Sequence, residues 1–139
     1  MSAIGYATAI FALPWLAARW TRLPMDGAAR KLAPGAMARL PLGVTHYRWD
    51  GPRDGRPLVL IHGLTTPSFV WDALVPRLNK AGYRTLRYDL YGRGFSDRPI
   101  ARQSPGFFRR QLGDLLDEQG IRAPVPLLGY SMGGVIAAA

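Results

Sequence analysis

Gly129-Tyr130-Ser131-Met132-Gly133-Gly134 is the stretch of sequence on which the prediction of the fold depends. An apolar run, Val125–Leu128, precedes it, and small and apolar residues, Val135–Ala139, follow it. This order predicts a strand, a sharp turn and a helix. A serine on so tight a turn needs neighbours without side chains, and the glycines two positions to either side supply them. The turn would present the hydroxyl of Ser131 beside the first N–H groups of a helix, which favour developing negative charge.

Composition limits the classes of protein to consider. The chain has 139 residues, enough for one domain at most, and 48% of them are hydrophobic, which suffices for a core. It has no cysteine and two histidines, so neither a disulfide framework nor a thiolate or histidine-rich metal site is expected. The net charge of +9 indicates affinity for anionic surfaces, either lipid headgroups or nucleic acid. Because the basic residues are scattered, a soluble basic face is the ordinary interpretation.

Residues 1–22 form an apolar N-terminal segment. The run Ala3–Ala18 carries no charge, and Arg19 and Arg22 follow it. A helix of that length spans about 24 Å, less than the hydrocarbon core of about 30 Å, and Pro14 would kink it. No positive region precedes the run, as a signal peptide would require. The segment is predicted either to contact a membrane, as a helix or short anchor, or to pack on the rest of the molecule. The corresponding location is cytoplasmic or associated with the inner membrane.

The next residues predict a linker and then a hairpin. Residues 23–37 are rich in turn-forming and small residues and are taken as the linker. Ala38–Leu42 and Val44–Trp49 resemble two antiparallel strands, and residues 38–139 form the predicted domain. His46 lies in the second of these strands, where a structural role is expected.

Strands and helices alternate in the remainder of the chain. Helical spacing of apolar residues alternates with short apolar runs, and glycines end the helices. The predicted order is strand 58–61, helix 69–80, strand 85–88, helix 105–119, strand 125–130 and the helix from Met132. Such alternation implies a parallel sheet that is covered on both faces.

Two loops follow predicted strands, at the edge where sheets of this kind place ligands. The first is His62-Gly63-Leu64 and the second is the glycine-bearing segment Asp89–Asp97. The second loop matches no phosphate-binding fingerprint, since it has neither G-x-G-x-x-G nor G-K-S/T.

Taken in order, the H-G loop, the D-x-x-G-x-G-x-S loop and the G-x-S-x-G turn resemble the N-terminal half of the α/β-hydrolase superfamily. Specifically, they look like the branch that holds bacterial esterases, monoacylglycerol-lipase-like enzymes and C–C-bond hydrolases. It covers residues 38–139. The implied fold is a mostly parallel sheet with an N-terminal antiparallel hairpin. The implied partner is a small-molecule ester with an apolar acyl group, with no metal and no organic cofactor.

The resemblance also implies a role for individual residues. Ser131 matches the nucleophile, and the backbone N–H groups of Leu64 and Met132 match the oxyanion hole. The residues that shape the site are His62, Gly63, Gly129, Tyr130 and Gly133. A serine at position 131 argues against the dehalogenase and epoxide-hydrolase branches, which use aspartate there.

The chain departs from the family pattern after the nucleophile. In this fold the acid and the histidine follow the serine, but only eight residues follow Ser131. The sequence therefore resembles a longer hydrolase truncated after the nucleophile elbow, and the 139 residues alone are expected to be inactive. Three functions remain open: a serine esterase in its complete form, a C–C-bond hydrolase or thioesterase of the same fold, and a non-catalytic fragment or pseudoenzyme that binds a partner. Binding of nucleic acid has no supporting motif.

Overall fold

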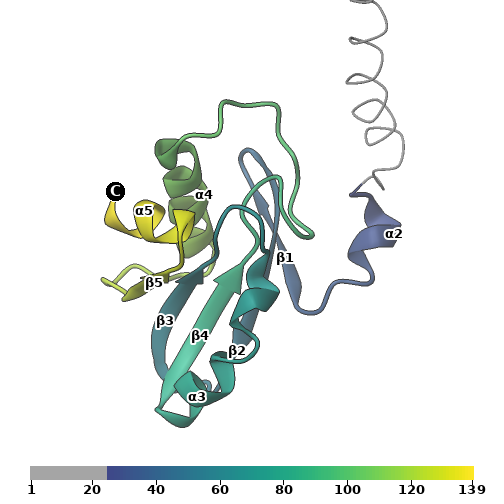
Figure 1. Cartoon of the computed structure of the whole chain (residues 1–139). Coiled ribbons are helices and arrows are strands. Elements are labelled where there is room, and N and C mark those ends of the chain that lie inside the picture. The colour runs from purple at the N-terminus through teal and green to yellow at the C-terminus, as the bar shows by residue number, and fades with distance from the viewer. Residues whose placement is uncertain (1–24) are drawn as a thin grey trace, which may run out of the picture.

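A five-stranded mixed sheet with the strand order β1-β2-β4-β3-β5 organises residues 25–139, the part of the chain that the computed structural model describes (Figure 1). β1 pairs with β2, and β2 with β4, in antiparallel fashion, whereas β3 lies parallel to both β4 and β5. The strands are β1 (Ala36–Leu40), β2 (Gly43–Asp50), β3 (Arg56–Ile61), β4 (Tyr83–Tyr88) and β5 (Leu127–Gly129). The expected N-terminal hairpin and the parallel strands that follow it are thus confirmed.

Helices cover both faces of this sheet (Figure 1). The helices of residues 25–139 are α2 (Gly27–Arg30), the 3-10 helix η1 (Ser68–Trp71), α3 (Val75–Lys80), α4 (Pro105–Glu118) and α5 (Met132–Ala138). α4 and α5 pack on one face, and η1 and α3 on the other. The predicted α/β arrangement is confirmed.

The apolar run in β3 is continuous because the strand is buried on both sides. Val59 and Ile61 belong to the core under α4 and α5, whereas Leu58 and Leu60 pack with η1 and α3. All four side chains are buried. The end of this strand is therefore rigidly placed, and it carries the H-G loop.

The helix predicted over residues 69–80 is wrong in its extent. The structure has a 3-10 turn over Ser68–Trp71 and an α-helix only over Val75–Lys80. Pro76 explains the split, because a proline has no N–H to donate and its ring clashes with the carbonyl four residues earlier. Pro76 is instead accommodated in the first turn of α3.

The strand predicted over residues 125–130 is shorter than expected. β5 spans Leu127–Gly129, although the backbone N–H of Val59 already donates to the carbonyl of Pro126 (3.0 Å). A proline has no N–H for a sheet ladder, so regular pairing begins after it. On its other side, β5 has no partner strand within residues 25–139.

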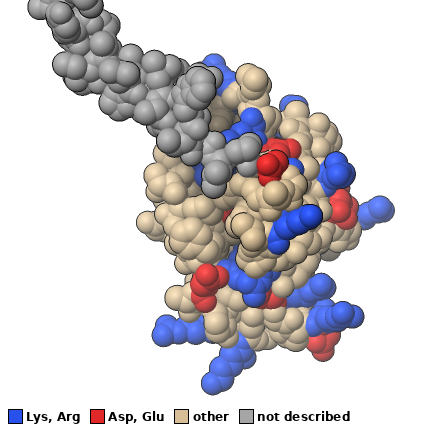
Figure 2. Space-filling model, turned by 90° about the vertical axis from the view of Figure 1, so that its right-hand side faces the viewer, with Lys and Arg blue, Asp and Glu red and all other residues tan. Residues whose placement is uncertain are grey.

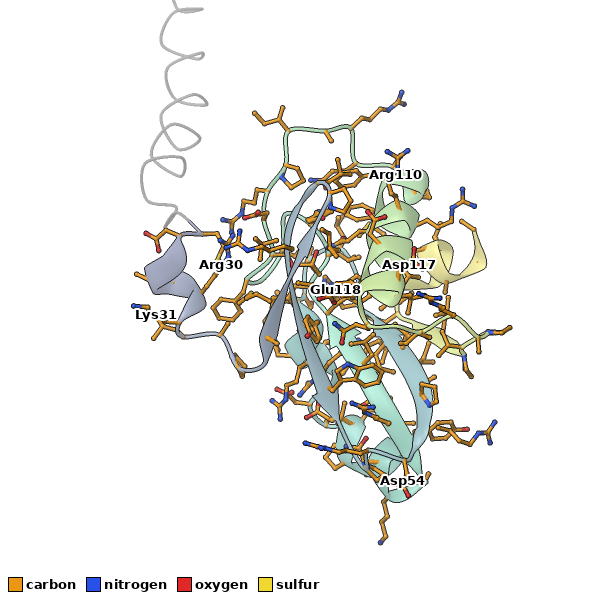
Figure 3. All side chains as sticks on the ribbon, turned by 180° about the vertical axis from the view of Figure 1, so that it is seen from behind. Arg30, Lys31, Asp54, Arg110, Asp117 and Glu118 are labelled. Carbon is orange, nitrogen blue, oxygen red and sulfur yellow. The ribbon has the colours of Figure 1, made fainter. Side chains whose placement is uncertain are left out.

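Helix α4 matches its prediction closely. Its N-cap, Ser104, accepts a hydrogen bond from the backbone N–H of Phe107 (3.2 Å), and Pro105 occupies the first turn. Gly120, with φ of +69°, follows the C-cap. Figure 3 shows Arg110 and Asp117 on this helix, and Asp54 at the other end of the sheet.

Short helix α2 lies within the predicted linker. Asp26 caps it by accepting from two backbone N–H groups (2.9 Å each), and Arg30 forms an ion pair with Asp97. The predicted apolar segment, residues 1–22, lies outside the described residues. Among residues 25–139, no helix has the length and apolar character needed to cross a membrane. Figure 2 shows cationic and anionic side chains interspersed on one face.

Candidate functional site

The turn between β5 and α5 is a strained one. Within residues 25–139, Ser131 alone among non-glycine residues has a positive φ (φ 52°, ψ −120°). The turn is closed by backbone hydrogen bonds from Gly133 to Tyr130 and from Gly134 to Ser131 (2.9 Å each). A residue in such a conformation costs about 1–3 kcal/mol, and strain of this kind clusters at functional sites.

Two glycines make room for this turn. A Cβ atom on Gly133 would overlap the carbonyl of Ile61 and lie 2.7 Å from that of His62. A Cβ atom on Gly129 would overlap the backbone of Gly133 and lie 2.5 Å from the nitrogen of Gly134. The elbow therefore sits directly against the end of β3, a position that no larger residue at either place would permit.

The H-G loop and the elbow meet at Gly63. A Cβ atom placed on Gly63 would lie 3.3 Å from Cβ of Ser131 and 3.2 Å from Cδ1 of Tyr130. The backbone N–H of Tyr130 donates to the carbonyl of Ile61 (3.0 Å), which extends the strand pairing up to the loop. The structure thus brings the predicted nucleophile and the predicted oxyanion loop together.

The two predicted oxyanion donors have free backbone N–H groups. Neither Leu64 nor Met132 donates its backbone N–H to an acceptor in residues 25–139. Met132 is the first residue of α5, where an N–H has no partner inside the helix. Leu64 is half exposed and Ser131 is exposed, so this corner of the site is open to a ligand.

His62 is fully buried and supports the loop. Its Nε2 accepts from the backbone N–H of Leu90 (2.9 Å), which assigns the proton to Nδ1, and Nδ1 donates to the carbonyl of Gly63 (2.7 Å). Burial lowers the pKa of this imidazole, so the ring is neutral. Both ring nitrogens are occupied, and neither is free to take a proton from Ser131.

Arg93 also holds the predicted oxyanion loop, and the sequence alone does not single it out. Its Nε donates to the carbonyl of Leu64 (2.9 Å), and its Nη1 donates to Tyr91 (3.0 Å) and Gln103 (2.6 Å). Its place in the glycine-bearing loop after β4 was the one available signal, since nothing in the spacing points back to Leu64.

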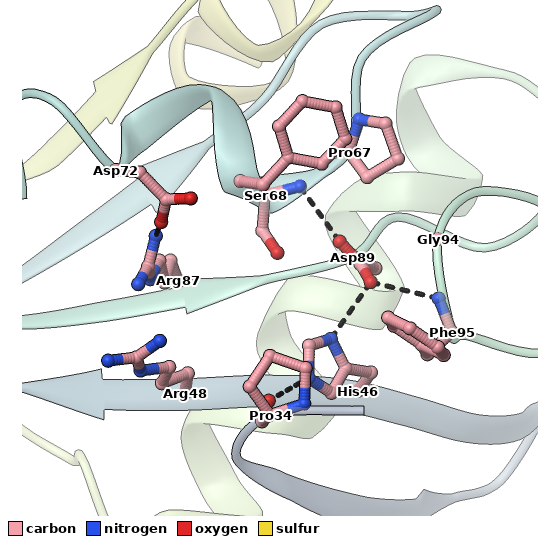
Figure 4. A pocket seen from close by; sticks show the side chains of 11 residues that line it. Pro34, His46, Arg48, Pro67, Ser68, Asp72, Arg87, Asp89, Gly94 and Phe95 are labelled. Carbon is pink, nitrogen blue, oxygen red and sulfur yellow. Dashed lines mark hydrogen bonds and ion pairs between the residues drawn. The ribbon is translucent and has the colours of Figure 1, made fainter. Parts of the chain in front are cut away.

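Asp89 connects three segments of the chain (Figure 4). Its carboxylate accepts from the backbone N–H groups of Ser68 (2.8 Å) and Phe95 (2.9 Å) and from Nδ1 of His46 (2.8 Å). Nε2 of His46 donates to the carbonyl of Pro34 (2.5 Å). These residues border a cavity of about 400 Å³ that includes none of the elbow residues.

His46 and Asp89 form a buried ion pair. Burial disfavours the charge on His46, but the hydrogen bonds to Asp89 and to the Pro34 carbonyl outweigh it and raise the pKa of the imidazole. Burial also disfavours the charge on Asp89, yet the hydrogen bonds from His46, Ser68 and Phe95 lower the pKa of the carboxyl group.

Ser68, His46 and Asp89 do not form a catalytic triad. A triad needs the histidine between the hydroxyl and the carboxylate. Here the carboxylate lies in the middle, and both nitrogens of His46 already have partners. This geometry favours the structural role that is expected for His46.

The chain matches a family model described as alpha/beta hydrolase fold over residues 56–139. Among curated relatives, it is 48% identical to a haloalkane dehalogenase of Mycobacterium marinum over 54 residues, which cover 39% of this chain and 18% of the relative.

Solved structures show the same likeness over a longer stretch. The enol-lactonase from Burkholderia xenovorans LB400 is 32% identical with a TM-score of 0.69, covering 73% of this chain and 39% of the other. An esterase from Exiguobacterium antarcticum is 27% identical with a TM-score of 0.68, covering 75% and 38%. The chain therefore spans less than a fifth of the dehalogenase and about two fifths of these two structures.

Proposed function

Because the chain belongs to the alpha/beta hydrolase fold family, we propose that it carries the nucleophile of a serine hydrolase that cleaves carboxylic esters. The observation that carries this proposal is the strained Ser131, held at positive φ against the end of β3 by two glycines. Strain that surrounding backbone enforces at one serine is hard to explain by packing alone.

The proposed reaction is acyl transfer to water. Ser131 Oγ attacks the ester carbonyl and loses its proton to a histidine, the alcohol leaves with that proton, and water then cleaves the acyl-enzyme. The backbone N–H groups of Leu64 and Met132 stabilise the oxyanion, and one such donor lowers the barrier by about 3 kcal/mol. The base is a histidine outside residues 1–139, since both nitrogens of His46 and of His62 are occupied.

The proposed substrate has an apolar acyl group. Leu64 and Tyr130 expose half or more of their surface beside Ser131, which favours an apolar ligand over a charged one. Two structural neighbours are named as a lactonase and an esterase, which supports cleavage of an ester bond. The serine at position 131 argues against the dehalogenase branch, which uses aspartate there. No metal or cofactor is part of the proposal.

A fluorophosphonate probe tests the nucleophile directly. In the full-length protein, we expect the probe to label Ser131, and Ser131→Ala to abolish both labelling and hydrolysis of p-nitrophenyl butyrate. Ser104→Ala, which removes a serine at the cap of α4, should keep both. Labelling that survives Ser131→Ala would refute the assignment.

The same experiment also tests the alternative that the protein is a binding module and not an enzyme. A correctly folded full-length protein whose Ser131 is not labelled would favour a non-catalytic binding module. Labelling without ester turnover would favour a thioesterase or a C–C-bond hydrolase, to be resolved with thioester and diketone substrates. Contact of residues 1–22 with a membrane surface stays a prediction.

A further inference from the structure

The two peptide groups that flank Leu64 are both held by side chains. The carbonyl of Gly63, in the first peptide group, accepts from Nδ1 of His62 (2.7 Å). The carbonyl of Leu64, in the second, accepts from Nε of Arg93 (2.9 Å). In a trans peptide the C=O and N–H bonds point in opposite directions. Holding the Gly63 carbonyl on the buried His62 therefore turns the N–H of Leu64 away from the protein interior.

Arg93 is itself immobilised before it reaches the loop. Its Nη1 donates to the carbonyl of Tyr91 (3.0 Å) and to Oε1 of Gln103 (2.6 Å), and its guanidinium carbon lies 5.6 Å from the centre of the Phe108 ring. A guanidinium with several fixed partners is a rigid donor. The bond to Leu64 is accordingly preorganised.

His62 and Arg93, the side chains that hold the two peptide groups of Leu64, both depend on the loop of residues 89–97. Arg93 belongs to it, and the backbone N–H of Leu90 donates to Nε2 of His62 (2.9 Å). Asp89 anchors this loop by accepting from the N–H of Phe95 (2.9 Å), and its carbonyl accepts from the hydroxyl of Ser96 (2.6 Å). The loop after β4 thus determines the orientation of the loop after β3.

We infer that Arg93 is a positioning residue for the oxyanion hole, holding the Leu64 peptide groups so that the N–H of Leu64 faces the reacting carbonyl. The inference rests on the proposed ester hydrolysis at Ser131. The loop after β4 then contributes to catalysis as well as to the fold, because oxyanion donors are effective only when they are preorganised.

Three variants of the full-length protein test the inference. Arg93→Ala removes the donor, Arg93→Lys keeps the charge without the planar fork, and Arg98→Ala removes an exposed arginine five positions away. The measurements are kcat and KM for p-nitrophenyl butyrate, and affinity for a trifluoromethyl ketone, whose serine adduct carries an oxyanion. The ¹⁵N order parameter of the Leu64 amide gives a readout that does not depend on activity.

We expect Arg93→Ala to lower kcat about 10- to 100-fold with little change in KM, because a misplaced donor mainly affects the transition state. Affinity for the ketone should fall by a similar factor, and Arg93→Lys should recover part of both losses. The Leu64 order parameter should drop from about 0.85 towards 0.6 in Arg93→Ala. Arg98→Ala should resemble the wild-type protein in every measurement.

Two results would overturn the inference. One is an unchanged Leu64 order parameter in Arg93→Ala, which would show that Arg93 does not hold the loop. The other is a lowered order parameter with unchanged kcat and ketone affinity, which would reduce Arg93 to a brace of the fold. A wild-type protein that the fluorophosphonate probe does not label would instead refute the proposed function, and the order parameter would still decide whether Arg93 holds Leu64.

Discussion

At the scale of single residues, Gly133 and Gly134 are adjacent in the sequence but have different surroundings. A Cβ atom on Gly133 would lie 2.7 Å from the His62 carbonyl and closer still to that of Ile61, whereas one on Gly134 would lie 3.6 Å from the carbonyl of Gly129. The first approach forces backbone to move, and the second is an ordinary contact.

Gly133→Ala should therefore destabilise the full-length protein by about 3 kcal/mol, the upper range for overpacking. Gly134→Ala lies in α5 and should be neutral or stabilise by up to about 1 kcal/mol, since alanine favours the helix. Urea unfolding of the two variants measures the difference. Equal midpoints for both would contradict the packing of the elbow on β3.

His46 should make stability depend on pH in one direction. Its pKa in the folded state is raised above 6.5, so its contribution is complete below pH 6.5 and is lost as pH rises through the folded pKa. Asp89 has a lowered pKa, so its contribution is present above pH 3.8 and is lost as pH falls through the folded pKa.

The variant His46→Gln tests this pH dependence, because glutamine keeps a hydrogen-bond donor but does not titrate. Between pH 4 and 6.5 the variant should be less stable than the wild-type protein by about 3 kcal/mol, the cost of breaking a buried pair. The gap should narrow as pH rises towards 9, as followed by urea unfolding at each pH. A gap that stays constant from pH 5 to 9 would mean that the pKa of His46 is the same in the folded and unfolded states.

The residues of the candidate site differ in how far they lie, along the sequence, from the residues that they contact. Ser131, Gly129 and Gly133 lie within one short motif, and a tight turn needs them together, so the sequence alone pointed to them. The bond between Arg93 and Leu64 joins two loops 29 positions apart. No local pattern encodes such a pairing, because it depends on how β3 and β4 align side by side.

At the scale of elements, helix α4 was predicted within one residue and the helix over residues 69–80 was not. Ser104, Pro105 and Gly120 are strong start and stop signals whose effect is local. For the other segment the apolar spacing was helical, but Pro76 excluded a continuous α-helix. Spacing reports which side of a segment is buried, whereas backbone donors decide where the helix can begin.

Helix α4 offers a pair of substitutions with opposite expected effects. Gly113 lies in the helix with open space around its Cβ position, so Gly113→Ala should stabilise the protein by about 0.5–1 kcal/mol. Ser104→Ala removes the side-chain cap and should cost about 1 kcal/mol. Both are measured by urea unfolding of the full-length protein. If Gly113→Ala is destabilising, a part of the protein outside residues 25–139 packs against that face of the helix.

At the scale of the whole molecule, the sheet in residues 25–139 has one edge that invites pairing. β5 is the last strand in the order, and its outer side has no partner strand within these residues. Leu128, Tyr130 and Val135, on β5 and the segment that follows it, expose large apolar surfaces. An unpaired edge flanked by apolar side chains is a template for another strand.

A polypeptide of residues 25–139 expressed alone should therefore self-associate through β5. Leaving out residues 1–24 removes the apolar N-terminal run as a competing cause of association. Leu128→Lys places a charge on the strand and should shift the population towards monomer, because a lysine on an edge strand opposes pairing. Ile100→Lys is the matched control, since Ile100 is fully exposed in the loop before α4, away from this edge.

Light scattering after size-exclusion chromatography at about 100 μM reports the mass of each variant. A monomeric parent polypeptide would show that the edge does not pair, and an equal shift by both lysine variants would show that added charge, rather than the edge of β5, controls association.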